Sequence, residues 1–95
     1  MVSVIGSPGL PSHVVLEGFV GSDIRVDDSG TLRLDEVTVA RTEGALETFC
    51  MYFSGDVIGG QGLHRLTMPG HSPTDVFLVT VAPGVHEAIV TRAGP

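Results

Sequence analysis

Three histidines and one aspartate supply the side-chain types that bind transition metals. His64, His71, His86 and Asp75 offer imidazole and carboxylate ligands of the kind that hold Zn²⁺. A metal site needs these side chains on one face of one element or on facing elements. The spacing therefore has to be tested against the strands that carry them.

The expected strand pairing separates two of these histidines. If the proline-containing loop 69–73 joins two antiparallel strands, register symmetry places His64 opposite about Leu78. The turn after residue 82 places His86 opposite about Val81. Positions of opposite parity face opposite sides of a sheet, so we expect no metal site, and one partly buried histidine with two exposed ones.

Acid–base chemistry has a second set of candidates around His64. That side chain shares its parity with the apolar residues that follow it, so it can point inward beside Cys50 or Glu47. A Cys–His pair could form a nucleophile, and a Glu–His pair could shuttle protons, with Tyr52 as a further polar group. Neither spacing is diagnostic, and a cysteine that packs as a small hydrophobe explains Cys50 equally. We therefore favour a protein without catalytic activity.

The glycine-rich stretch 55–62 is a loop and not a phosphate-binding motif. Such motifs need a lysine or a following helix N-terminus, and the chain contains no lysine. No ordered Ser, His and Asp signature is present either. We expect no cofactor.

Short apolar segments separated by glycine and proline predict an all-β fold. Alternation over 24–26 and 32–34 around Asp28-Ser29-Gly30 predicts a hairpin, and Pro83-Gly84 suits a type II turn between a second pair of strands. The alternation changes phase at Asp35-Glu36, which predicts a β-bulge or a corner.

Two segments, 46–53 and 76–82, are apolar on both parities and are predicted to be core strands buried on both faces. Residues 13–20 fit either a strand or one to two turns of helix with Ser12 as N-cap. Residues 1–12 are rich in glycine, proline and serine and are predicted to form a flexible arm. Residues 13–95 then form one domain.

Charge excludes several partners. Eleven acids face five scattered arginines, for a formal charge of -6 over 95 residues. Nucleic acids and anionic membranes both recruit basic side chains, so we expect neither as a partner. The first twenty residues contain no basic region followed by an unbroken apolar stretch, and one cysteine agrees with a reducing compartment, so we expect a cytoplasmic protein.

Four stretches resemble an uncharacterised bacterial family of domains of unknown function. They are Asp35-Glu36-Val37, the run 49–55 (Phe-Cys-Met-Tyr-Phe-Ser-Gly), the run 61–66 (Gln-Gly-Leu-His-Arg-Leu) and the run 77–81 (Phe-Leu-Val-Thr-Val). The resemblance covers about residues 14–92. It departs from the family where His64 replaces a tyrosine, Thr80 replaces a proline, and 69–73 replace a glycine-containing turn. It implies a small β fold and no established catalytic residues. Some members are encoded beside tail-collar-like proteins.

The prediction is one small all-β domain with six to eight short antiparallel strands, in a compact barrel or a two-sheet sandwich. We expect a non-catalytic accessory or protein-interaction domain, with a homodimer or another protein as partner, because open strand edges invite pairing. The alternative is a small barrel that binds an apolar molecule and acts as an isomerase or cyclase. The genomic neighbourhood adds a third alternative, a structural component of a phage-tail-like particle. If the protein is instead the barrel that binds an apolar molecule, its pocket is predicted to be lined by Phe49, Met51, Phe53, Phe77 and Val79.

Overall fold

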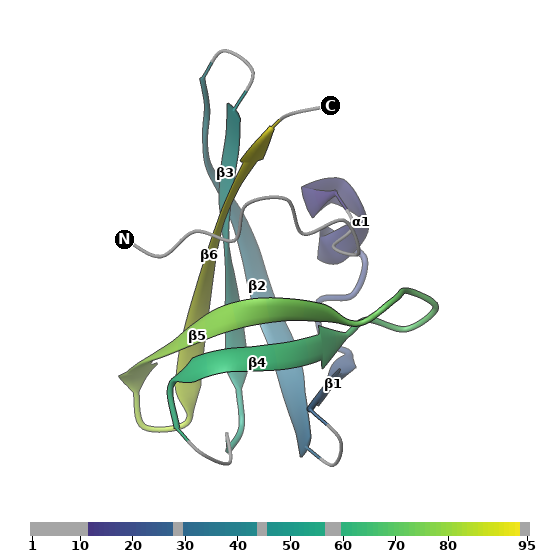
Figure 1. Ribbon diagram of the computed structural model, residues 1–95, viewed down its shortest axis with the longest axis vertical. Helices are drawn as coiled ribbons and strands as arrows, with labels where there is room; N and C mark the ends of the chain where they lie inside the picture. Colours follow the sequence, from purple (N-terminus) through teal and green to yellow (C-terminus); the bar gives the residue numbers. More distant parts are fainter. Residues whose placement is uncertain (1–11, 28–29, 44–45, 57–59, 94–95) are drawn as a thin grey trace.

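The described residues of the protein form a closed barrel of six antiparallel strands with one short helix beside it (Figure 1). A computed structural model describes residues 12–27, 30–43, 46–56 and 60–93, and within them the side chains of all but 39–43, 46–47 and 92–93. The elements are α1 (His13–Glu17), β1 (Asp23–Val26), β2 (Gly30–Glu43), β3 (Leu46–Ser54), β4 (Gly62–Thr67), β5 (Thr74–Ala82) and β6 (Val85–Ala93). Their order around the barrel is β1-β2-β3-β6-β5-β4. The all-β prediction is confirmed, as a barrel and not as a sandwich.

The expected hairpins and the bulge are present. Val26 pairs with Gly30, which leaves a three-residue connection between β1 and β2. The β2–β3 register shifts between Leu34 and Glu36, so the change of alternation at this point marks a β-bulge. Gly84 has φ +71°, the left-handed conformation that the third position of a type II turn requires.

Residues 13–17 are helical, which decides between the two structures that the sequence allowed. The Ser12 side chain accepts a hydrogen bond from the Val15 backbone N–H at 3.4 Å, as an N-cap does. Leu16 belongs to the buried core cluster, so α1 packs against the side chains of the barrel interior. The rest of the predicted arm, residues 1–11, lies outside the described residues. No helix in the described part of the chain is long and apolar enough to cross a membrane.

The barrel closes unevenly. The short strand β1 pairs with β4 over only two residue pairs, and β5 pairs with β6 only near their turn, up to Val79 and Glu87. In contrast, β6 pairs with β3 along its whole length. Figure 1 shows β4 and β5 crossing the long strands β2, β3 and β6. Among the described residues, β6 beyond Glu87 is therefore paired on one edge only.

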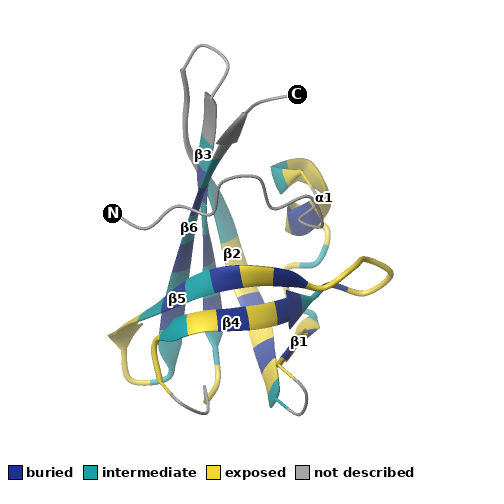
Figure 2. Ribbon diagram, in the orientation of Figure 1, coloured by how far each residue is buried: buried dark blue, intermediate teal, exposed yellow. Residues whose placement is uncertain are grey.

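Side chains from every strand fill the interior of the barrel. Burial alternates along the strands (Figure 2), so that Val76 and Leu78 of β5 point inward while Phe77 and Val79 point outward and are half-buried. The prediction of two strands buried on both faces was wrong for their outer face, because no described element covers it. The buried apolar residues are Leu16, Ile24, Val26, Leu32, Leu34, Phe49, Met51, Phe53, Leu66, Met68, Val76, Leu78, Ala88 and Val90.

Candidate functional site

Two histidines, His64 and His86, lie on the inner side of the barrel wall and are only 7% and 4% exposed. The prediction that they face opposite sides, with one partly buried histidine in the chain, was wrong. His86 pairs with Thr80 and not with Val81, because the β5–β6 register shifts at Val81. This bulge adds one residue to β5 and reverses the parity that we counted from the turn.

The ring of His64 is held between two oxygen atoms. Nδ1 lies 2.8 Å from Asp27 Oδ2, and Nε2 lies 2.7 Å from the carbonyl oxygen of Gly60. Both oxygens can only accept, so both ring nitrogens donate when both bonds are made, and the ring is then an imidazolium. Burial on its own would lower the pKa of His64, but the hydrogen bonds to Asp27 and Gly60 outweigh it and raise the pKa above 6.5.

Asp27 extends the β1–β4 pairing beyond the end of β1. Its backbone N–H donates to the Arg65 carbonyl at 2.7 Å, and its Oδ1 accepts from the Arg65 backbone N–H at 3.0 Å. The residue has φ +54°, a left-handed conformation that aspartate tolerates better than most residues. The hydrogen bond from His64, followed by that from Arg65, lowers the pKa of Asp27 below 3.8. The Asp27 carboxylate thus adds a side-chain hydrogen bond to the junction of β1 and β4, where the two strands pair over only two residue pairs.

His86 has a different pair of partners. Its Nδ1 lies 3.0 Å from the Thr80 hydroxyl, and its Nε2 lies 2.9 Å from the Gly55 carbonyl oxygen. A neutral ring satisfies both, because Nε2–H donates to Gly55 while the hydroxyl donates to Nδ1. Gly55 N–H donates to the Gly84 carbonyl at 3.0 Å, which fixes it to the β5–β6 turn. The two histidines therefore hold residues 55 and 60, on either side of the β3–β4 connection.

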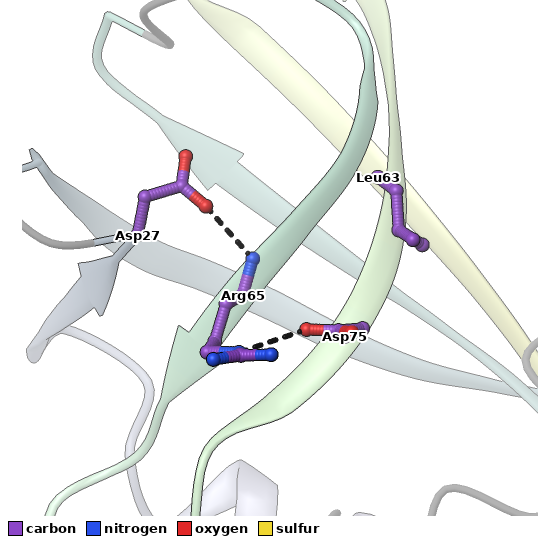
Figure 3. A pocket seen from close by; sticks show the side chains of 4 residues that line it. All are labelled: Asp27, Leu63, Arg65 and Asp75. Carbon is purple, nitrogen blue, oxygen red and sulfur yellow. Dashed lines mark hydrogen bonds and ion pairs between the residues drawn. The ribbon is translucent and has the colours of Figure 1, made fainter.

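A shallow depression of about 260 Å³ lies on the outer surface beside this cluster (Figure 3). It is lined by Asp27, Leu63, Arg65 and Asp75. Arg65 Nε and Asp75 Oδ1 form an ion pair at 3.1 Å, and both side chains are well exposed. Because the charges are already paired and solvated, the depression offers little to a charged ligand.

The proposed catalytic side chains are not brought together. His64 points inward from β4, whereas Cys50 and Tyr52 lie on the half-exposed outer face of β3. The side chain of Glu47 lies outside the described residues. Burial and the charge of Glu87 raise the pKa of the Cys50 thiol, which makes it a poor nucleophile.

Tyr52 is likewise not activated. A hydrogen bond to Glu87, with burial and the charges of Glu87, Cys50 and Glu36, raises the pKa of Tyr52 to about 12. A phenol with this pKa stays protonated at neutral pH and donates to Glu87. It pairs two neighbouring strands on the outer surface of the barrel.

The five residues that were expected to line a pocket lie on two sides of the barrel wall. Phe49, Met51 and Phe53 point into the core and have no exposed surface, while Phe77 and Val79 point outward. Among the described residues, no group of three metal-ligating side chains occurs either. Among the described side chains, the imidazole–carboxylate pair of His64 and Asp27 has neither Cys50 nor Tyr52 beside it, because these two lie on the outer face of β3.

The sequence did not indicate Asp27 as the partner of His64, because Asp27 lies at the edge of the predicted turn around Asp28-Ser29-Gly30. The two residues are 37 positions apart and meet only when the barrel closes. An aspartate directly after an alternating strand was the one available signal, and it fits a turn equally well.

Fold and site together define a small closed β-barrel whose two buried histidines are hydrogen-bonded on both ring nitrogens, while the buried hydroxyl of Thr74 has no hydrogen-bond partner. Residues 12–90 match the family described as a domain of unknown function, DUF6916, and the chain belongs to that family. The predicted resemblance to an uncharacterised domain family is confirmed. Comparison with curated proteins and with solved structures found no match.

Proposed function

We propose that this barrel is a non-catalytic accessory domain that acts by binding another protein chain through its outer surface. The observation that supports this is the packed interior: Phe49, Met51 and Phe53 are fully buried among apolar neighbours. A barrel of six strands leaves little room once its inner side chains are in place. The alternative, an apolar-ligand barrel with isomerase or cyclase activity, lacks a supporting observation.

In the part of the chain that the structure describes, the edge of β6 that β5 leaves unpaired is the surface best suited to such binding. Ala82 and Val85 pair across the two-residue turn, so the backbone groups of Val85 point toward β5. Directions alternate along a strand, so Ile89 and Thr91 direct theirs toward the edge that β5 leaves open. An open edge of this kind accepts an additional strand from another chain.

The charge of the chain favours a particular class of partner. With a formal charge of -6, two copies repel each other, whereas a basic strand is attracted. A second copy nevertheless satisfies the same backbone groups, as does a neighbouring subunit of a larger particle such as a phage-tail-like assembly. A cytoplasmic location is part of this proposal.

The test compares two substitutions at Thr91 in the tagged full-length protein, purified from its own cells. Thr91→Pro removes the N–H that faces the open edge, while Thr91→Val keeps it and removes only the hydroxyl that contacts Thr48 at 3.2 Å. We expect the wild type and Thr91→Val to bring down the same partner chain and Thr91→Pro to lose it. Equal binding by all three proteins, or binding by none, would overturn the proposal.

A further inference from the structure

The geometry points to a proton-operated lock at the start of β4: charged His64 fastens the backbone at Gly60 to the barrel, and loss of the ring proton releases it. The two partners of the ring, Asp27 Oδ2 and the Gly60 carbonyl oxygen, are 2.8 and 2.7 Å away and can only accept. A neutral imidazole carries one N–H. It can therefore serve one of these oxygens and not both.

The neutral His64 ring keeps its hydrogen bond to Asp27. A carboxylate is a stronger acceptor than a backbone carbonyl, and Asp27 is also fixed by two hydrogen bonds to the backbone of Arg65. The neutral ring then turns a lone pair toward the Gly60 oxygen at a distance too short for two acceptors. Gly60 is at φ +74°, where glycine moves with little steric cost. The Gly60 carbonyl is therefore the group that moves away from the His64 ring.

The charged groups around His64 favour the protonated ring. Asp27, from the turn after β1, touches the ring. Arg65, on the same strand, is ion-paired with Asp75 of the adjacent strand β5. The residue that pairs with His64 on β5 is Val76, which is apolar and buried. In the described part of the chain, the carboxylate of Asp27 is thus the charge in contact with the ring.

His86 provides an internal control within the same molecule. It holds Gly55 by the same kind of Nε2–carbonyl bond, but its other partner is the hydroxyl of Thr80, which can donate as well as accept. Neutral His86 keeps both bonds. One end of the β3–β4 connection is therefore fastened whether or not its histidine is charged, and the other end only when its histidine is charged.

The experiment is an NMR pH titration of the isotope-labelled full chain. It follows the ring shifts of His64 and His86 together with the backbone shifts of Gly60, Gln61 and Gly55. We expect His64 to titrate with a midpoint above 6.5, and Gly60 and Gln61 to shift with the same midpoint. Gly55 should not follow it. A His64 midpoint at or below 6.5, or a Gly60 signal that ignores the His64 titration, would overturn the proposal.

Asp27→Asn separates a lock from a merely structural contact. The asparagine oxygen can still accept from Arg65 N–H, while its NH₂ donates to neutral His64, which then donates Nε2–H to Gly60. We expect the shift of the Gly60 signals between pH 6 and pH 9 to be lost in this variant, with the His64 midpoint lowered. A variant that keeps the wild-type transition would contradict the lock. If Asp27→Asn fails to fold, His64→Gln, which cannot titrate, should lose the same transition.

Discussion

Replacing Phe53 with alanine tests whether the barrel interior is packed or open. Phe53 is on β3 and has no exposed surface, so truncation leaves a cavity among residues that cannot fully collapse into it. A Phe→Ala change at such a site costs about 3–5 kcal/mol. The free energy of unfolding of a domain of 95 residues is roughly 5–14 kcal/mol at the usual stability per residue. The variant should therefore lose about a fifth or more of its free energy of unfolding.

Phe77→Ala is the matched control, because it removes the same ring from the outer face of β5, where the side chain is half-buried. Half of the usual burial energy gives a cost of about 1 kcal/mol. Urea unfolding followed by circular dichroism measures both, and thermal unfolding should show a fall in Tm of roughly 12–40 °C for Phe53→Ala. If Phe53→Ala costs no more than Phe77→Ala, the interior is not tightly packed and the argument against a ligand pocket fails.

Three further predictions concern the hydrogen-bonded clusters. Tyr52 should ionise near pH 12 in an ultraviolet absorbance titration, and Glu87→Gln should bring its pKa back toward 10; an unchanged titration would contradict the pairing. Gly55→Ala should destabilise the protein by about 1–3 kcal/mol in urea unfolding, because φ is +130° and the new Cβ would lie 2.9 Å from a buried leucine methyl. The hydrogen bond between Asp27 and His64 should stabilise the wild type most between pH 3.8 and 6.5. Its contribution falls as pH drops through the lowered pKa of Asp27, and as pH rises through the raised pKa of His64, whereas Asp27→Ala should lack both changes in unfolding free energy.

Local patterns predicted much of the fold. The alternation on either side of Gly30 and the Pro83-Gly84 pair specified two hairpins, because turn geometry and strand periodicity depend on neighbouring residues alone. The phase change at Asp35-Glu36 located a bulge for the same reason. Barrel or sandwich could not be decided, since closure depends on contacts between distant strands.

The candidate site was not predictable in the same way. The bulge at Val81 lies within a segment that is apolar on both parities, so no change of alternation indicates it, and the inward position of His86 was missed. The bond between Asp27 and His64 spans 37 residues and follows from the short pairing of β1 with β4. Which side chain hydrogen-bonds the backbone beyond the end of a strand depends on the tertiary arrangement of distant strands, and the local sequence does not specify that arrangement.

Native mass spectrometry of the protein purified from its own cells tests the proposed binding function most directly. We predict a species heavier than the 9.9 kDa monomer, formed with a second copy or another protein, that Thr91→Pro loses and Thr91→Val retains. A bare monomer would contradict it. So would a monomer that retains an apolar small molecule, since that result would place the binding site inside the barrel.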